Sequence, residues 1–165
     1  MKRHTRYVVP VAFLAYLLMA GSLLGQSSAA KPSASSIEIK PMDSGELPIP
    51  PAFRAAIYEN LIVEIKKTGK FEQVYRSGDK DAANLPNLVT LRMVAQSFKK
   101  GSQKKREVTT VSGSTSISLK VQISDRAGKM LVDQDVVGKV RFFGENLRAT
   151  YDFSKKVAKI VQTAF

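Results

Sequence analysis

One stretch, Ser116–Asp125, limits the possible folds of this chain more than any other. Within it, apolar and polar residues alternate without a break from Ser116 to Ser124, and the apolar ones are Ile117, Leu119, Val121 and Ile123. Successive side chains of a β-strand point to opposite faces of the sheet, so strict alternation predicts a strand with one buried face. The other face, which carries serine, lysine and glutamine, is expected to contact water. The chain must therefore supply a second layer for one side of a sheet only.

Two segments with a helical period can supply that layer. In Ala52–Thr68 the apolar residues recur at intervals of three and four, and they are Phe53, Ala56, Ile57, Leu61, Ile62 and Ile65. Pro50 and Pro51 suit the start of this helix, and Gly69 suits its end. Near the C-terminus, Asn146 is predicted to cap a second helix. Its inward stripe is expected to be Leu147, Tyr151, Ser154, Val157, Ala158 and Val161.

Further strands are predicted around these segments. Their expected ranges are Ile37–Lys40, Phe71–Arg76, Leu88–Phe98 and Lys129–Phe142. Asp125–Gly128 is predicted to be a hairpin turn, Gly138 to mark a bulge or bend, and Phe165 to pack against the domain. The expected fold class is α/β (α+β), a two-layer sandwich with a mostly antiparallel or mixed sheet of four to five strands. Two helices are expected to cover one face of that sheet.

The first thirty residues are interpreted as an export signal. Basic side chains make its first six residues positive, and an uncharged, mostly apolar run extends from Tyr7 to Gly25. The small residues Ser28, Ala29 and Ala30 follow, so cleavage near Ala30 and a periplasmic or secreted protein are expected. A run of about 20 apolar residues can also cross a bilayer. An uncleaved anchor in the inner membrane is therefore the alternative.

The expected organisation is a signal peptide at 1–30, a flexible lead-in at 31–36 and a single α/β envelope domain at 37–165. The chain has no cysteine or tryptophan, and its single histidine, His4, belongs to the signal. The exported domain would then lack thiols and imidazoles, two groups that nucleophilic catalysis and metal binding commonly use. We therefore expect a protein that is not an enzyme and that needs no metal and no cofactor.

Basic residues strongly outnumber acidic ones in the exported part. The chain has 26 Lys and Arg and 14 Asp and Glu, and three of the basic residues lie in the signal, so the domain carries 23 − 14 = +9. Outside the cytoplasm, this charge favours an acidic protein surface, anionic lipid headgroups or acidic glycans over nucleic acid. The expected partner is thus an envelope protein or an anionic surface. Charge spread over solvated faces for solubility is the alternative.

The densest charge lies between two predicted strands, at the tip of a hairpin. Five cations fall within eight residues that contain no acidic side chain, and they are Lys99, Lys100, Lys104, Lys105 and Arg106. A hairpin tip projects from its sheet, so these side chains are accessible to a partner. They form the candidate site for an anionic surface, held by an attraction that salt weakens. A solvated tip without a partner is the other interpretation.

Two polar pairs are candidates for catalysis. Asp133 and Asp135 share one face of the returning strand about 6.6 Å apart, a separation suited to acid–base carboxylates. Charges that deter aggregation at an edge strand are the preferred interpretation of this pair. Ser118 and Lys120 also share a face, but neighbours two apart on a solvated strand are expected by chance. A hydrolase is therefore the weakest of the functional hypotheses.

Lys67–Arg76, the alternating strand closed by Asp125–Gly128 and the Ala- and Lys-rich C-terminal helix together resemble recurring elements of bacterial envelope domains. The chain resembles an uncharacterised family of exported proteins, a domain of unknown function. That family is similar in architecture to the small α/β domain of the curli secretion channel subunit and to the N-terminal domain of TolB. The resemblance covers roughly Ser36–Ala164 and implies a non-catalytic envelope module, but it transfers no functional residue.

The leading functional hypothesis is thus a non-catalytic, exported binding or assembly module of the bacterial cell envelope. The alternative is a peripheral adhesin for anionic lipid or glycan that works through the basic hairpin at 99–106. The identity of the partner and the oligomeric state stay open at this point.

Overall fold

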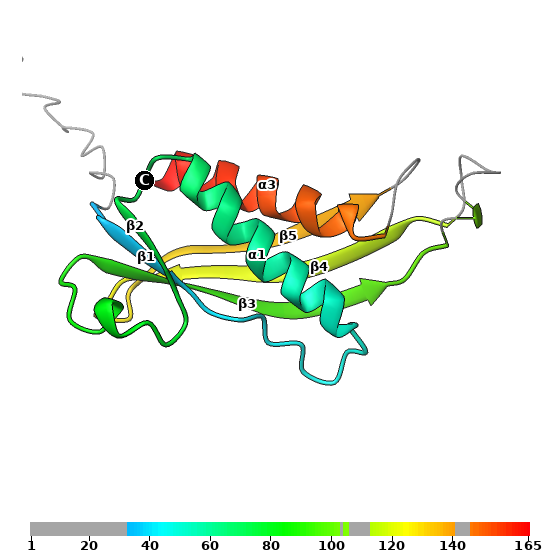
Figure 1. Ribbon diagram of the computed structural model, residues 1–165, viewed down its shortest axis with the longest axis horizontal. Coiled ribbons are helices and arrows are strands. Elements are labelled where there is room, and N and C mark those ends of the chain that lie inside the picture. The colour runs from blue at the N-terminus through cyan, green and yellow to red at the C-terminus, as the bar shows by residue number, and fades with distance from the viewer. Residues whose placement is uncertain (1–32, 103, 106–112, 141–145) are drawn as a thin grey trace, which may run out of the picture. The chain divides into compact units, whose positions relative to one another are not determined.

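A mixed sheet carries two helices on one of its faces in the computed structural model, which describes residues 33–102, 104–105, 113–140 and 146–165 (Figure 1). The five strands are β1 (Ser36–Ile39), β2 (Gln73–Arg76), β3 (Leu88–Lys99), β4 (Thr115–Ser124) and β5 (Met130–Val140). Their order across the sheet is β2-β1-β3-β4-β5. This arrangement confirms the predicted two-layer fold class.

The sheet combines parallel and antiparallel pairing because its connections differ. β1 lies parallel to both β2 and β3, whereas β3, β4 and β5 pair antiparallel in sequence order. A parallel pair needs a long crossover, and the helix α1 (Pro51–Lys67) supplies it between β1 and β2. A short turn suffices for an antiparallel pair, and Gly128 in the turn between β4 and β5 has a φ of +84°.

The alternating stretch forms β4, the central strand of the antiparallel part. Every second side chain in it is fully buried beneath the helices, and these are Thr115, Ile117, Leu119, Val121 and Ile123. The residues between them are only partly buried and lie on the opposite face of the sheet, which we call the open face. The sequence pattern therefore predicted correctly which face of β4 is covered.

The first helix begins and ends where the sequence predicts. Pro50 is the N-cap of α1 and Pro51 its first residue, where a missing N–H costs no helical hydrogen bond. After the helix ends at Lys67, Gly69 adopts a φ of +64°, a left-handed conformation that favours glycine. The buried apolar side chains of α1 are Phe53, Ile57, Leu61, Ile62 and Ile65.

The last helix, α3 (Arg148–Ala164), differs from the prediction at its first turns. Its N-cap is Leu147 and no side chain caps it, so Asn146 does not have the predicted capping role. Leu147 and Tyr151 are 38% and 41% exposed, whereas Phe153 is fully buried. The helix faces the sheet with Phe153 because a phenyl ring can be buried without a partner for a hydroxyl group. The other predicted inward residues, Ser154, Val157, Ala158 and Val161, are buried as expected.

Gly138 does not form the predicted bulge or bend. It pairs with Ile117 in regular register, and the only shift between β4 and β5 lies between Ile123 and Ser124. A Cβ atom at this position would lie 2.2 Å from the backbone oxygen of Ala149 and 2.7 Å from Cβ of Phe153. Glycine therefore occurs here because α3 approaches β5 closely.

The helices lie side by side and run in the same direction across the sheet (Figure 1). Asn60 of α1 donates a hydrogen bond of 3.0 Å to Oγ1 of Thr150 of α3. The rings of Phe165 and Phe71 lie 5.2 Å apart, which confirms that the C-terminal residue packs against the domain. The predicted export signal and Arg106 lie outside the described residues. Among the helices of the described residues, none is both long and apolar enough to cross a membrane.

Candidate anionic-surface site

Four of the five predicted basic residues, Lys99, Lys100, Lys104 and Lys105, lie at one end of the sheet, which we call the hairpin end and define as the described residues 99–102, 104–105, 113–114, 139–140 and 146–148. Lys99 is the last residue of β3, Lys100 follows it, and Lys104 and Lys105 are exposed and helical in backbone conformation. The connection leads directly into the antiparallel partner β4, as the predicted hairpin requires. Arg106, the fifth predicted residue, lies outside the described part of the chain.

Strand register adds a cation that the sequence analysis missed. Ser116 of β4 pairs with Lys99 on one side and with Lys139 of β5 on the other. Residues paired across a sheet point to the same face, and Ser116 lies on the open face. Lys99 and Lys139 therefore flank a serine on that face, although 40 residues separate them in sequence. Only a correct pairing of all three strands could have revealed this row.

Both helices also direct positive charge to the hairpin end. In the first turn of α1, the ring of Phe53 lies 5.1 Å from Phe98, the residue before Lys99. α3 begins within the hairpin end at Arg148, and neither helix has an acidic residue in its first turn. A helix N-terminus carries roughly half a positive charge from its aligned peptide dipoles. These dipoles therefore reinforce the lysines.

A buried polar network fixes the base of the hairpin end. The hydroxyl group of Thr115, which is fully buried, accepts a hydrogen bond of 3.1 Å from the Gly101 N–H. It donates in turn to Oδ1 of Asn146 over 2.8 Å. Three segments are joined in this way: the end of β3, the start of β4 and the residues before α3. The cations thus project from a base held by hydrogen bonds.

The sequence of the hairpin end is strongly basic as a whole. Its described residues contain six Lys or Arg and no Asp or Glu, which gives a net charge of 6 − 0 = +6. The opposite end of the sheet comprises the connection 77–87 and the turn 125–129, and we call it the turn end. Its three basic and three acidic residues give a net charge of 3 − 3 = 0. Charge is therefore concentrated at one end of the sheet.

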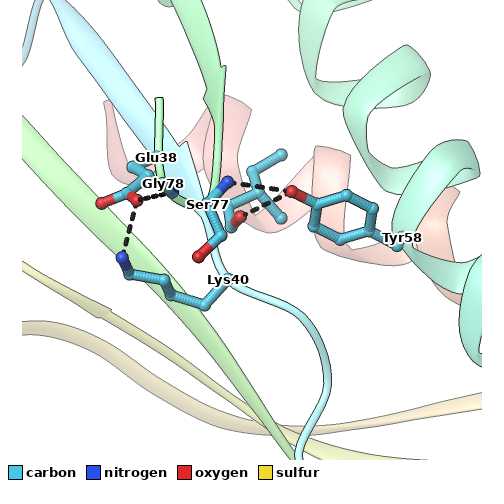
Figure 2. A network of polar contacts seen from close by, with 6 residues as sticks. Glu38, Lys40, Tyr58, Ser77 and Gly78 are labelled. Carbon is cyan, nitrogen blue, oxygen red and sulfur yellow. Dashed lines mark hydrogen bonds and ion pairs between the residues drawn. The ribbon is translucent and has the colours of Figure 1, made fainter. Parts of the chain in front are cut away.

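Charged groups at and near the turn end hold its connection in place. Figure 2 shows that Oε1 of Glu38 accepts hydrogen bonds from Nζ of Lys40 at 2.6 Å and from the Gly78 N–H at 3.2 Å. The hydroxyl group of Tyr58 accepts a hydrogen bond of 3.0 Å from the Ser77 N–H. These contacts fasten the chain that follows β2 to β1 and α1.

Two arginines complete the fastening. The guanidinium group of Arg126 donates to the carbonyl oxygens of Leu85 and Ala83, both at 2.9 Å. Arg76, at the end of β2, forms a two-pronged ion pair with Glu59 of α1, with both N···O distances 2.7 Å. This hydrogen bonding holds the pKa of the Glu59 carboxyl below its usual value. Arg126 and Arg76 thus form contacts inside the fold.

The acidic pair lies on the open face of β5, which is an edge strand of the sheet, as the preferred interpretation assumed. Asp133 accepts a hydrogen bond from Gln122 at 3.2 Å and pairs with Lys120 at 3.4 Å. Asp135 accepts a hydrogen bond of 2.7 Å from Gln96. Each carboxylate therefore has its own polar partners, on β4 for Asp133 and on β3 for Asp135, and the structure does not join the two into a shared acid–base site.

The sequence matches no known protein family and no curated protein sequence. Its fold is similar to that of a PelC variant from Paraburkholderia phytofirmans, which forms a dodecamer; the TM-score is 0.57 at 11% identity, over 79% of this chain and 88% of PelC. A protein from Chlamydia trachomatis, CT253, has a TM-score of 0.52 at 12% identity, over 79% of this chain and 97% of its own. A Xanthomonas campestris protein of the DUF330 family has a TM-score of 0.50 at 11% identity, over 81% of this chain and 86% of its own.

These similarities establish the fold and agree with an uncharacterised domain family. At this level of identity they carry no functional residue to this chain. The predicted resemblance in architecture to the curli channel domain and to the N-terminal domain of TolB stays a prediction.

Proposed function

We propose that this domain is a non-catalytic module of the bacterial envelope that binds an anionic surface through its hairpin end. The observation that carries the proposal is the row formed by Lys99, Ser116 and Lys139, which gathers cations from two distant segments beside Lys100, Lys104 and Lys105. The proposal includes the predicted export of the domain. A basic domain outside the cytoplasm meets anionic headgroups and acidic glycans rather than nucleic acid.

The magnitude of the attraction supports the proposal. A lysine or arginine close to an anionic membrane contributes up to about 1 kcal/mol, and the contribution falls off within a Debye length. Several cations on a fixed base therefore give measurable adhesion at low salt, while the neutral turn end gives little. The bound groups are phosphates or carboxylates, which both anionic lipids and acidic glycans display.

A test of the site uses single substitutions at the two ends of one strand pair. Lys139→Gln removes the cation that only the register identifies, and Lys129→Gln removes a cation at the turn end that is also exposed. The described core lies between Ile37 and Val161, so the chain from Lys31 onward carries all of it without the apolar run. We expect Lys139→Gln to weaken binding to anionic vesicles by up to about fivefold, which corresponds to one cation.

The same assay distinguishes the two sources of anionic groups. Wild-type protein is titrated at low salt with vesicles containing anionic lipid, with neutral vesicles and with an acidic glycan. Binding to the anionic vesicles alone identifies lipid, and binding to the glycan alone identifies glycan. Equal effects of Lys139→Gln and Lys129→Gln would refute the hairpin end as the site, and so would affinity that does not fall with salt.

A second function, assembly of several copies, is supported by the similarity in fold to PelC, whose structure is a dodecamer. Assembly would strengthen binding to a surface, because linked copies engage it together and the second contact becomes intramolecular. Sedimentation of the chain from Lys31 onward at increasing concentration tests this function. A single monomeric species throughout would refute it.

A further inference from the structure

An apolar groove runs between the edge strand β5 and the helix α3. It has a volume of about 720 Å³, and its apolar side chains include Leu131, Val132, Val136 and Ile160. A groove beside a free strand edge can accept an added strand, whose backbone pairs with the edge while its side chains enter the groove. The geometry of this edge decides which strand fits.

The helix α3 closes one half of the edge. The Lys139 N–H donates a hydrogen bond of 2.9 Å to Asp152, and the carbonyl oxygen of Val137 accepts one of 2.7 Å from Lys156. Backbone groups of an antiparallel strand alternate in direction, so the N–H groups of Asp133 and Asp135 point outward as well. No hydrogen bond to either N–H is made within the described part of the chain. The free half of the edge is therefore Leu131–Asp135.

The two carboxylates on the free half disfavour pairing of β5 with β5 of a second copy. In a two-fold antiparallel pair centred on Asp133, Gln134 or Asp135, carboxylates of the two copies face each other directly. Like charges placed opposite each other destabilise a strand pair. Registers centred beyond Asp135 move the pair toward Val137 and Lys139, where α3 already occupies the edge. Symmetric pairing centred on Asp133 or beyond is thus opposed by charge or by α3, whereas neither opposes a pair centred on Leu131 or Val132.

The strand at the other edge of the sheet, β2, brings no like charge to the free half of β5. β2 is parallel to β1 and β3, and β5 is antiparallel to β4, so β2 and β5 run in the same direction. β2 is four residues long, close to the length of the free half of β5. On the open face it carries Gln73 and Tyr75, which pair with Ser36 and Glu38 of β1. Neither side chain would repel Asp133 or Asp135.

We propose that copies of this chain assemble head to tail, with β2 of one copy added parallel to the free half of β5 of the next. This inference rests on the second proposed function and names its interface. Each copy offers one edge of each kind, so the contact is heterologous and continues until a ring closes. The sheets of neighbouring copies then form one continuous sheet.

The test exploits the absence of cysteine from the natural sequence. Two full-length variants, Gln134→Cys and Val74→Cys, are mixed in mild detergent and oxidised. One of them carries an added short peptide, so that the mixed disulfide differs in mass from a disulfide of either variant with itself. Both positions lie on the helix side of their strands. A pair of Gln134→Cys with Arg92→Cys, on the exposed face of a central strand, is the matched control. We expect on the order of tenfold more mixed disulfide in the first pair, because Cα atoms more than about 7 Å apart cannot be bridged.

Each other outcome overturns the interface. A disulfide formed by Gln134→Cys alone means symmetric β5 pairing. In a parallel experiment, a lysine-reactive cross-linker is applied to wild type. If it gives higher oligomers while the cysteine pair forms no disulfide, copies assemble through other surfaces. The interface is then refuted and the second proposed function is retained. Where neither reagent links the chains, both the interface and that function fail. Circular dichroism of each variant establishes that it is folded.

Discussion

The hairpin end and the turn end of the sheet use charged residues in different ways. At and near the turn end, Glu38, Arg126 and the pair of Arg76 and Glu59 form hydrogen bonds that fasten a connection to the sheet and to α1. At the hairpin end, a network of Thr115 and Asn146 holds the base, and the described residues carry a net charge of 6 − 0 = +6. Charged groups near the turn end thus pair with groups of opposite sign or with carbonyl oxygens inside the fold, whereas the described hairpin end carries an excess of cations.

The largest loss in the free energy of unfolding is expected from Gly138→Ala, which disrupts the close packing of α3 against β5 near the hairpin end. A Cβ atom here meets the backbone oxygen of Ala149 at 2.2 Å, so α3 or β5 must move. Overpacking of this kind typically costs about 1–3 kcal/mol. Chemical denaturation should show such a loss in the free energy of unfolding. A variant as stable as wild type would mean that α3 does not depend on this close approach.

A smaller loss is expected from Thr115→Val, which keeps the shape of the side chain but removes its hydroxyl group. The Gly101 N–H and Oδ1 of Asn146, both partly buried, each lose their hydrogen bond to the fully buried Thr115. Loss of a hydrogen bond at a buried site costs about 1–3 kcal/mol. Thr90→Val, on the partly exposed open face of β3, is the control and should be close to neutral. Equal stability of the two variants would show that the network does not hold the base.

The smallest effect is expected from Glu59→Gln, which breaks the ion pair beside the turn end. The pKa of Glu59 is lowered from 4.5 by its hydrogen bonds with Arg76, so the folded state binds a proton less readily than the unfolded one. The stabilisation is present above pH 4.5 and is lost as the pH falls through the lowered pKa. It stays small because the two side chains are 53% and 54% exposed.

Denaturation of wild type and Glu59→Gln at neutral and acidic pH checks the sign. The difference in their free energies of unfolding should shrink as the pH falls. A difference that grows in acid would contradict the assignment of this pair.

Local patterns were sufficient to predict much of the fold. The alternation from Ile117 to Ile123 indicated which face of β4 is buried, and the spacing of Phe53, Ile57 and Leu61 indicated the inner face of α1. Tertiary contacts decided the rest. The burial of Phe153 gives α3 an inner face that differs from the predicted stripe. Glycine occurs at position 138 because α3 packs closely against it, and not because of a bulge or bend in β5.

The candidate site was predictable only in part for the same reason. Lys99 and Lys100 were recognised because they lie in one dense run of sequence. Lys139 belongs to the site through two strand registers, and periodicity does not fix a register. The spacing of Asp133 and Asp135 likewise placed both on one face, but spacing alone does not assign Gln96 and Gln122 as their partners.

The central claim is that the position of the cations, and not the net charge alone, determines binding. Two triple variants with the same net charge test it directly in the anionic-vesicle assay. One replaces Lys99, Lys100 and Lys104 by Gln, and the other replaces Lys70, Lys80 and Lys129, which are also exposed but lie outside the hairpin end. At up to about 1 kcal/mol for each cation, the first should lose roughly 30- to 100-fold in affinity, whereas the second stays within about threefold of wild type. Equal losses in the two variants would contradict the account.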